Sequence, residues 1–197
     1  MTRSSSRLSR PNGKHDPNAQ RIFELGEYIS LPASSQSGIV VAPCEIGQGL
    51  FAFRNFSLGE TIFWFSGKVI DYDEINARDP SLAGHPLQVD WNRYIDVDPP
   101  GYFVNHSCDP NTGLRDNLRL VALKPIKVGD EIRFDYSTET GGQRWTMNCR
   151  CGSNKCRGVI GDFDLLAPTL QRELLRLEIV QPYIVRRLIE KCRTDEH

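Results

Sequence analysis

Short runs of aromatic and β-branched residues, repeated about every ten residues, restrict the fold of this chain most strongly. The runs are IVVAP, GLFAFRNF, TIFWFSGKVI, RYIDVDPPG, NLRLVALKPI and DEIRFDYST. Such spacing leaves no room for the helices of about 10–15 residues that connect parallel strands in α/β proteins. The region from 39 to 137 is therefore predicted to be mainly β, with many short strands and one short helix at 71–79.

The two flanks differ from this region in composition. Residues 1–20 hold four basic side chains against one acid, Asp16, and are predicted to be a disordered basic arm that either contacts an acidic partner or is simply solvated. Residues 21–38 are a mixed flanking segment. From 162 to 197 apolar residues recur with helical spacing, and Pro182 separates two predicted amphipathic helices. These helices either cap the β-domain or present a surface to a partner.

The composition excludes several classes of protein. The formal net charge is −1, so bulk charge predicts neither a nucleic-acid partner nor a membrane partner. No apolar run approaches the roughly 18 residues of a membrane span, and no signal-peptide pattern follows the basic arm. We therefore expect an intracellular protein, in the cytoplasm or, in a eukaryote, in the nucleus with chromatin. Direct nucleic-acid binding is not expected, and the oligomeric state stays open.

The cysteine spacing predicts a metal site. Six cysteines stand at positions 44, 108, 149, 151, 156 and 192. In a reducing compartment, a cysteine cluster indicates a metal site rather than a disulfide framework. CRCGSNKC places Cys149, Cys151 and Cys156 close together, and a structural zinc ion needs four ligands. Cys108 is the candidate for the fourth, and the remaining two cysteines are interpreted as ordinary thiols.

Two further motifs combine polar groups with turn residues. NHSCDPN at 105–111 contains an amide, an imidazole, a thiol and a carboxylate, although Ser, Asp and Pro also form plain turns. GQGLFA at 47–52 matches the G-x-G-x-x-A form of a dinucleotide fingerprint. The strand-like FAFRNF that follows excludes the helix which that fingerprint needs. The glycines therefore indicate either a close backbone approach or a tight turn.

The strand-like stretch GDEIRFDYS places two aromatic side chains together. Alternation puts Phe134 and Tyr136 on the same face of the strand. Two aromatic residues on one face are usually core, but a buried Tyr hydroxyl needs a polar partner. Tyr136 is therefore a candidate for the lining of a pocket.

Together these motifs resemble those of SET-domain protein lysine methyltransferases with a post-SET zinc segment, in particular the small stand-alone SET proteins. GQGLFA, NHSCDPN, GDEIRFDY and CxCGSxxCRG occur in that order, and the resemblance covers residues 39–161. It implies a SET domain at 39–137, a post-SET zinc segment at 138–161 and a C-terminal helical extension at 162–197. The implied fold is a β-clip of short twisted sheets, with the NHSC segment threaded through a pseudoknot at the active site.

The resemblance also implies the roles of individual residues. Tyr136 matches the catalytic tyrosine, and Phe134 lacks the hydroxyl that would limit the number of methyl groups, so di- or trimethylation of a lysine is expected. The residues implied to bind S-adenosylmethionine are Gly47, Gln48, Gly49, Leu50, Asn105, His106, Trp145 and Arg150. The implied ligands of one structural Zn²⁺ are Cys108, Cys149, Cys151 and Cys156.

Two positions depart from the family pattern. Leu87 or Gln88 stands where many relatives carry an aromatic residue of the lysine channel, and Tyr102 stands where they often carry Arg. The main hypothesis is an S-adenosylmethionine-dependent methyltransferase that acts on a lysine of a protein or peptide. The alternative is a SET fold without turnover that serves as a zinc-stabilised binding or scaffold module. A zinc nucleic-acid binder is disfavoured, because the cysteine spacing is not that of a finger and the basic residues outside the arm are not gathered on one strand or helix.

Overall fold

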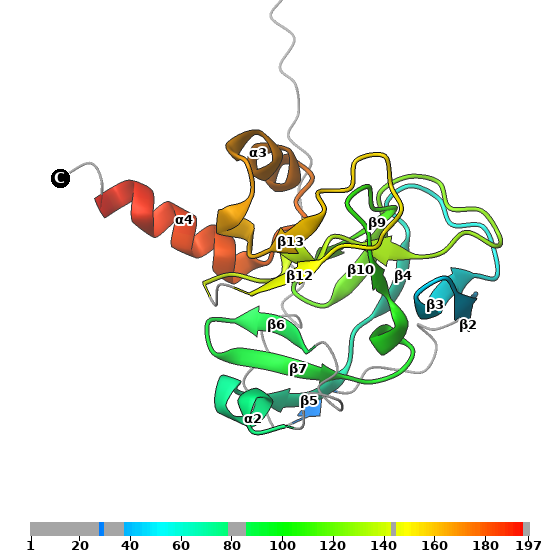
Figure 1. The fold of residues 1–197 in the computed structure, drawn as a ribbon, viewed down its shortest axis with the longest axis horizontal. Coiled ribbons are helices and arrows are strands. Elements are labelled where there is room, and N and C mark those ends of the chain that lie inside the picture. The colour runs from blue at the N-terminus through cyan, green and yellow to red at the C-terminus, as the bar shows by residue number, and fades with distance from the viewer. Residues whose placement is uncertain (1–27, 30–37, 79–85, 143–144, 195–197) are drawn as a thin grey trace, which may run out of the picture.

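The structure, a computed structural model, describes residues 28–29, 38–78, 86–142 and 145–194 (Figure 1). The predicted basic arm at 1–20 and nearly all of the flanking segment at 21–38 lie outside these residues. Short sheets dominate the described chain, and helices follow them at its C-terminal end. The predicted mainly β fold with C-terminal helices is therefore confirmed, whereas the domain boundaries remain predictions.

Two antiparallel sheets and two hairpins form most of the β-structure. The first sheet has the order β1 (Tyr28–Ile29), β5 (Gly67–Ile70), β7 (Arg93–Val97) and β6 (Leu87–Asp90). The second has the order β4 (Thr61–Trp64), β10 (Arg119–Ala122) and β9 (Thr112–Arg115). The hairpins pair β2 (Ile39–Cys44) with β3 (Gly47–Ala52), and β12 (Thr146–Asn148) with β13 (Val159–Gly161). The strands of these sheets and hairpins that come from the aromatic and β-branched runs are β2, β3, β4, β5, β7 and β10.

The predicted short helix is α2 (Tyr72–Asn76), which follows β5. Asp71 caps it, since its side chain accepts from the backbone N–H of Glu74, and the side chain of Glu74 accepts from the N–H of Asp71. This reciprocal capping box stabilises a helix that has no buried residue of its own.

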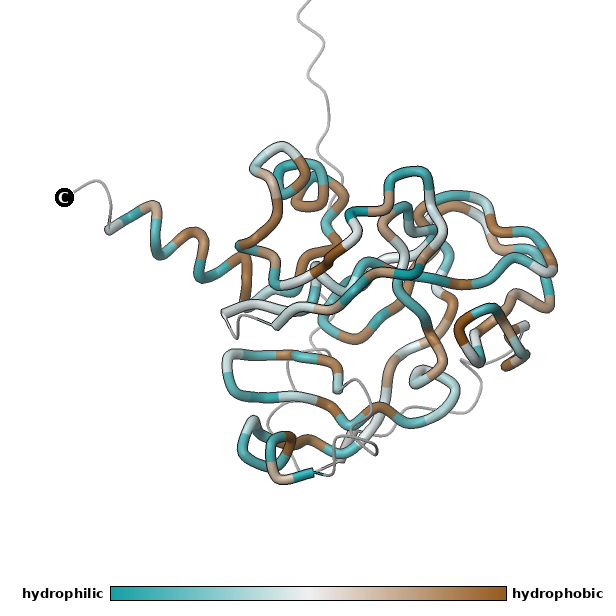
Figure 2. The backbone as a smooth tube through the Cα atoms, in the orientation of Figure 1, coloured by the Kyte–Doolittle hydropathy of each residue, from teal (hydrophilic) through white to brown (hydrophobic). Residues whose placement is uncertain are grey.

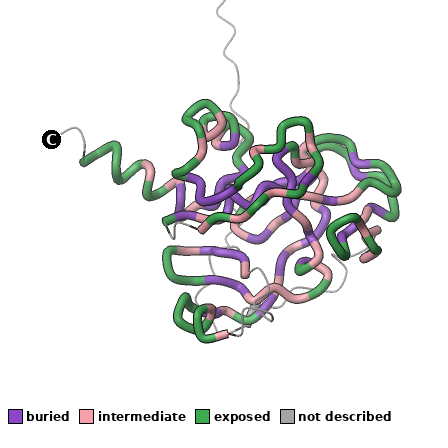
Figure 3. Tube along the Cα trace, in the orientation of Figure 1, coloured by how far each residue is buried: buried purple, intermediate pink, exposed green. Residues whose placement is uncertain are grey.

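The aromatic runs supply the main hydrophobic core. Phe63, Phe65, Leu50 and Ile132 are almost completely buried there, together with Ile95 of β7. Apolar residues colour the strands of the central body brown in Figure 2, and the same stretches are buried in Figure 3. The core therefore lies between the sheets, where aromatic side chains fill the space that short strands leave.

A second, smaller core joins the C-terminal helices to the β-body. It contains Phe163 of the 3₁₀ helix η4 (Phe163–Leu165), Leu174 of α3 (Pro168–Arg176), and Tyr183 and Ile184 of α4 (Pro182–Thr194). Pro182 is the first residue of α4, a position where the missing N–H of proline costs nothing. The distal part of α4 reaches away from the body (Figure 1) and is exposed (Figure 3). The buried residues of η4, α3 and the first turn of α4 thus cap the β-domain.

A sheet of only two short strands brings the NHSCDPN motif beside the GDEIRFDY motif. β8 (Asn105–His106) runs parallel to β11 (Arg133–Phe134). On the other edge of β11, the Asn111 side chain accepts from the N–H of Arg133 at 2.9 Å and donates to the carbonyl of Glu131 at 2.8 Å. β11 therefore lies inside the turn formed by residues 105–111, which is the threading that a pseudoknot requires.

Candidate functional site

The pairing of β8 with β11 brings the NHSC motif beside the aromatic strand. Arg133 is opposite Asn105, Phe134 is opposite His106, and the N–H of Ser107 donates to the carbonyl of Phe134 at 3.0 Å. Successive residues of a parallel strand direct their backbone groups to opposite edges. The N–H and C=O of His106 therefore point away from β11. Within the described part of the chain, no other strand pairs with that edge of β8.

The Asn105 side chain lies against β3. Its Nδ2 donates to the carbonyl of Gln48 at 2.9 Å and to Glu131 Oε1 at 2.9 Å. These two bonds use both amide hydrogens, so Oδ1 is the acceptor that the side chain can offer to a ligand. A Cβ at Gly49 would lie only 2.6 Å from Glu131 Oε1. A side chain at position 49 would therefore displace that carboxylate from its present place, and the glycine motif and the NHSC motif form one cradle.

The His106 imidazole links this cradle to the tyrosine segment, which we define as residues 135–141. The backbone N–H of Tyr136 donates to Nδ1 at 3.2 Å, and Nε2 lies 3.2 Å from Cys108 Sγ. Burial lowers the pKa of His106 to about 4, so the ring is neutral near neutral pH. Because Nδ1 accepts a hydrogen bond, the single ring proton belongs on Nε2, directed at the sulfur. Asp135 Oδ1 lies 3.6 Å from Nδ1, which is too far for a hydrogen bond that would draw the ring proton to Nδ1.

Tyr136 is buried at the centre of the site. Its hydroxyl donates to the carbonyl of Val104 at 2.8 Å, and its ring centroid lies 5.3 Å from that of His106 and 4.9 Å from that of Phe134. Burial raises the pKa of Tyr136 far above that of an exposed tyrosine, and the nearby Glu139 carboxylate adds to the effect. The hydroxyl therefore stays neutral, so it can orient a ligand but cannot act as a strong base.

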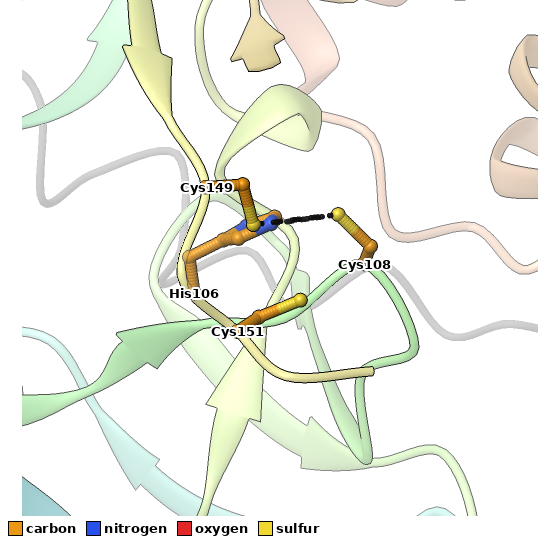
Figure 4. A group of neighbouring side chains, drawn as sticks. All are labelled: His106, Cys108, Cys149 and Cys151. Carbon is orange, nitrogen blue, oxygen red and sulfur yellow. Dashed lines mark hydrogen bonds between the residues drawn. The ribbon is translucent and has the colours of Figure 1, made fainter. Parts of the chain in front are cut away.

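Cysteines from two segments converge beside His106 (Figure 4). The ligand atoms of His106, Cys108, Cys149 and Cys151 all lie within 4.8 Å of one another. The sulfurs of Cys108 and Cys149 are 3.7 Å apart, and a tetrahedron with zinc–sulfur bonds of about 2.3 Å separates its sulfurs by about 3.8 Å. Cys156 is exposed, and its thiol interacts with those of Cys149 and Cys151. Three of the four predicted cysteines thus lie in one group with the imidazole, and Cys156 adjoins that group beside Cys149 and Cys151.

The pKa values of the thiols indicate that a bound cation is needed before all of them can ionise. Burial raises the pKa of Cys108 and of Cys149. Burial also acts to raise the pKa of Cys151, but backbone N–H donors from Cys108 and Ser153 and the neighbouring thiols bring it down to about 7. Several adjacent thiols cannot all ionise without a compensating charge. A bound zinc ion would supply that charge and would deprotonate the thiols that coordinate it.

Arg157 ties the cysteine segment, residues 145–161, to the tyrosine segment. Its guanidinium donates to the two oxygens of Asp135 at 2.6 and 2.7 Å and to Ser137 Oγ at 3.1 Å. Its backbone N–H donates to Cys108 Sγ at 3.4 Å. The Asp135 carboxylate is only 1% exposed, so this bidentate pair compensates a buried charge.

Sequence reasoning missed three charged residues of the site: Glu131, Arg133 and Asp135. They alternate with the apolar residues of DEIRFDY, and that alternation could have placed them together on one side of the strand. Arg157 was expected only to offset the charge of the thiolates, and its pairing with Asp135 was not foreseen. The sequence reasoning also missed Cys44, an expected ordinary thiol, whose Sγ lies 3.6 Å from Asn105 Nδ2.

The two residues predicted beside an adenine lie in the cysteine segment. Trp145 is half-buried against the main core, and Arg150 is exposed between Cys149 and Cys151. Their role in binding a cofactor stays a prediction.

The positions that depart from the family pattern are occupied in two different ways. Gln88 is buried; its backbone N–H donates to Glu139 Oε2 at 2.7 Å, and its Oε1 accepts from the N–H of Gly141 at 3.2 Å. Burial raises the pKa of Glu139 to about 8. Tyr102, in contrast, is 55% exposed. A polar network therefore fixes β6 to the tyrosine segment at the place where an aromatic side chain is common in relatives.

Within the described residues, no helix has both the length and the apolar character needed to cross a bilayer.

Comparison with known proteins identifies the type of domain. Residues 47–137 match the family model of the SET domain. A mouse protein named "Histone-lysine N-methyltransferase, H3 lysine-36 specific" is 31% identical over 169 residues, covering 76% of this chain and 6% of the mouse protein. Drosophila melanogaster Histone-lysine N-methyltransferase Su(var)3-9 is 30% identical over 182 residues, covering 71% of this chain and 29% of that protein. The Neurospora crassa protein named H3 lysine-9 specific dim-5 is 34% identical over 110 residues, covering 45% and 32%. The chain thus spans less than a third of the length of each of these relatives.

Proposed function

We propose that this chain, in which residues 47–137 form a SET domain, transfers a methyl group from S-adenosylmethionine to a lysine of a protein substrate. The observation that carries the proposal is the neutral Tyr136 hydroxyl, which is fixed on the carbonyl of Val104 next to the cradle of Gly49 and Asn105. The names of the relatives support the same reaction class. They also make a histone tail the first substrate to test, and a nuclear, chromatin-associated setting the first localisation to test.

The residues of the cradle fit the cofactor. Oδ1 of Asn105, the acceptor left by its two donated bonds, suits the ammonium group of the methionine end, beside the backbone of residues 47–50. The backbone edge of His106 that faces away from β11 offers a donor and an acceptor to an adenine ring, with Trp145 and Arg150 on its border. When bound, the cofactor supplies an electrophilic methyl group on a sulfonium centre.

The protein contributes positioning more than acid–base chemistry. A lysine attacks only as the neutral amine, and its reference pKa is about 10.4. An apolar channel beside a cationic sulfonium favours that neutral form by desolvation and repulsion. Tyr136, itself protonated, orients the amine and lines the transfer pore. Alignment of the reacting atoms then provides much of the acceleration.

Phe134 is the residue that we expect to set the number of methyl groups. Its ring packs edge-on to Phe65 at 6.0 Å and against Tyr136 at 4.9 Å. It has no hydroxyl to hold a water molecule in the pore, which leaves space for a methylated amine. Di- or trimethylation follows, and Phe134→Tyr should shift the product toward monomethyl-lysine. A mass spectrum in which wild-type enzyme in excess stops at one methyl group would contradict this part of the proposal.

The zinc site is proposed to use Cys108, Cys149, Cys151 and Cys156. The Nε2 proton of His106 directs a hydrogen bond at Cys108 Sγ, so the imidazole orients a ligand instead of ligating the metal itself. Four thiolates around Zn²⁺ leave a formal charge of −2, which the N–H groups of His106 and Arg157 and the adjacent guanidinium of Arg157 partly offset.

Calorimetric titration of S-adenosylmethionine into the purified chain, with the zinc content measured on the same sample, is the first test. We expect cofactor binding with one zinc per chain. Tyr136→Phe should then reduce methyl transfer by at least about 100-fold, because the amine loses its alignment, while cofactor affinity and zinc content stay unchanged. One zinc per chain without cofactor binding would instead identify a zinc-stabilised scaffold.

A further inference from the structure

A chain of polar contacts runs from the cofactor cradle to the backbone of a cluster cysteine, and Arg133 is at its centre. Arg133 Nη2 forms an ion pair with Glu131 Oε2, and Nη1 donates to the carbonyl of Cys151 at 2.9 Å. The other oxygen of the same carboxylate accepts from Asn105 Nδ2 at 2.9 Å. Arg133 thus touches the cysteine segment directly and reaches Asn105 through Glu131.

These contacts hold their partners in place more firmly than surface ion pairs do. The side chain of Glu131 is 10% exposed and that of Arg133 is 25% exposed, so solvent screens the pair only partly. The planar guanidinium offers donors in a fixed fork and reaches two acceptors at once, which a lysine ammonium on its flexible stem does less well. Gly49 lies against Oε1 of Glu131, since a Cβ at position 49 would be only 2.6 Å from that oxygen. The carboxylate is therefore held between Arg133, Asn105 and the glycine strand.

A cleft beside these residues makes the polar contacts necessary. A cavity of about 640 Å³ is lined by Glu131, Arg133 and Cys151, among other residues. Because this side is open, packing alone cannot keep the cysteine segment at a fixed distance from β11. The hydrogen bond from Arg133 to Cys151 spans part of that gap.

We propose that Arg133 is a positioning residue that couples the metal site to the cofactor site. A metal ion fixes Cys151, the carbonyl of Cys151 fixes Arg133, and Arg133 keeps Glu131 where it orients Asn105. The inference rests on the proposed function, because it needs the cofactor to bind at Asn105. Coupling between two binding sites is reciprocal. Bound cofactor must therefore raise the affinity of the chain for zinc by the factor by which zinc raises its affinity for the cofactor.

The experiment starts from zinc-loaded, full-length chain and measures zinc affinity by equilibrium competition with a chromophoric chelator. Each titration is made with and without saturating S-adenosylhomocysteine, which is the probe for the cofactor site. In wild-type chain we expect the probe to raise zinc affinity about fivefold or more, at the lower end of typical couplings between sites. In Arg133→Met the gain should disappear. Arg133→Lys, which keeps the charge beside Glu131, should lose most of the gain and carries the test if the Met variant does not fold.

Lys155→Met is the matched control. Lys155 borders the same cavity and lies in the cysteine segment, but it pairs with Asp109 and not with Glu131. It should keep the wild-type gain. A purely structural role of Arg133 would lower zinc affinity equally with and without the probe, and a gain preserved in Arg133→Lys and Arg133→Met would overturn the inference. Wild-type chain that binds the probe without any gain in zinc affinity would also overturn it, and the proposed function would stand. Failure of the wild-type chain to bind the probe would overturn both the inference about Arg133 and the proposed function.

Discussion

The cysteine segment and the C-terminal helix pair, residues 162–194, hold the two ends of the tyrosine segment by different forces. The cysteine segment holds its start through charge, since Arg157 binds both oxygens of buried Asp135. The helix pair holds its end through apolar packing around Phe163 and Ile184 and through uncharged hydrogen bonds to backbone carbonyls of the tyrosine segment. One of these runs from the Tyr183 hydroxyl to the carbonyl of Glu139, at 2.9 Å.

This difference separates placement from stability. Hydrogen bonds and ion pairs are directional, so the cysteine segment can set the position of the tyrosine closely, but its strength would depend on the proposed metal ion and on protonation. Apolar burial is not directional and is proportional to area, so the apolar contacts of the helix pair add stability without fixing an angle. The attachment through the cysteine segment and the attachment through the helix pair should therefore respond to different substitutions. A substitution that weakens one should leave the other unchanged.

The largest effect is expected from Arg157→Met. The substitution leaves the carboxylate of Asp135 buried without its cation, and breaking a buried pair in this way destabilises by about 3–5 kcal/mol. The free energy of unfolding in urea, measured with zinc present, checks the value. Lys155→Met, which removes a surface ion pair with Asp109, should change stability by less than about 1 kcal/mol. Equal changes in stability for the two variants would show that the buried ion pair of Arg157 with Asp135 contributes no more than the surface pair of Lys155 with Asp109.

Leu174→Ala should have a smaller effect, of about 2–3 kcal/mol. Leu174 is 4% exposed in the second core, and this small cluster at the edge of the molecule can relax around the lost methyl groups. Zinc content and cofactor affinity should stay at wild-type levels. The matched control is Leu177→Ala, because Leu177 follows the same helix and is 40% exposed. Loss of zinc from Leu174→Ala would mean that the two attachments are not independent.

The two regions also differ in how well the sequence predicts them. The helix pair was predicted from periodicity, because a helix that packs with one face repeats its apolar residues locally. The cysteine cluster was predicted from spacing, since CRCGSNKC is a local pattern of ligands. The contacts that join these regions to the tyrosine segment were not predicted. Arg157 and Asp135 are 22 residues apart, and Tyr183 and Glu139 are 44 apart, so only the folded topology pairs them.

The Asn105 cradle is an intermediate case. Asn105 and Gly49 were implied by a resemblance of motifs, whereas the carboxylate that joins them, Glu131, was overlooked. It stands in the same motif as Tyr136, but the alternation was applied only to the aromatic residues of that strand. The contact of the Glu131 carboxylate with both Asn105 and the glycine strand is a property of three segments at once. A linear pattern can contain all three residues without showing that they touch.

Glu139→Gln should give the smallest effect, about 1–2 kcal/mol, at low pH, where both side chains are neutral, and this effect should change as the pH rises. Glu139 is buried between β6 and the helix pair, since its Oε2 accepts from the N–H of Gln88 and its carbonyl accepts from the Tyr183 hydroxyl. Burial raises its pKa from 4.5 to about 8. A carboxyl group whose pKa is raised by folding contributes stability below its unfolded pKa and loses that contribution as the pH rises through its folded pKa. Wild-type stability should therefore fall relative to Glu139→Gln between pH 4.5 and about 8, since the amide keeps an acceptor for the N–H of Gln88 but never ionises.

The measurement is the difference in unfolding free energy between wild type and variant on either side of neutral pH, with zinc present. Glu173→Gln, on the exposed face of α3, is the control and should give a difference that does not change with pH. Taking the difference between variants also removes the titration of the thiols, which all the chains share. A pH-independent difference for Glu139→Gln would mean that the carboxylate is solvated in the folded chain. The helix pair would then not exclude water from the polar contact between Gln88 and Glu139, and its apolar packing could not be the force that holds this end of the tyrosine segment.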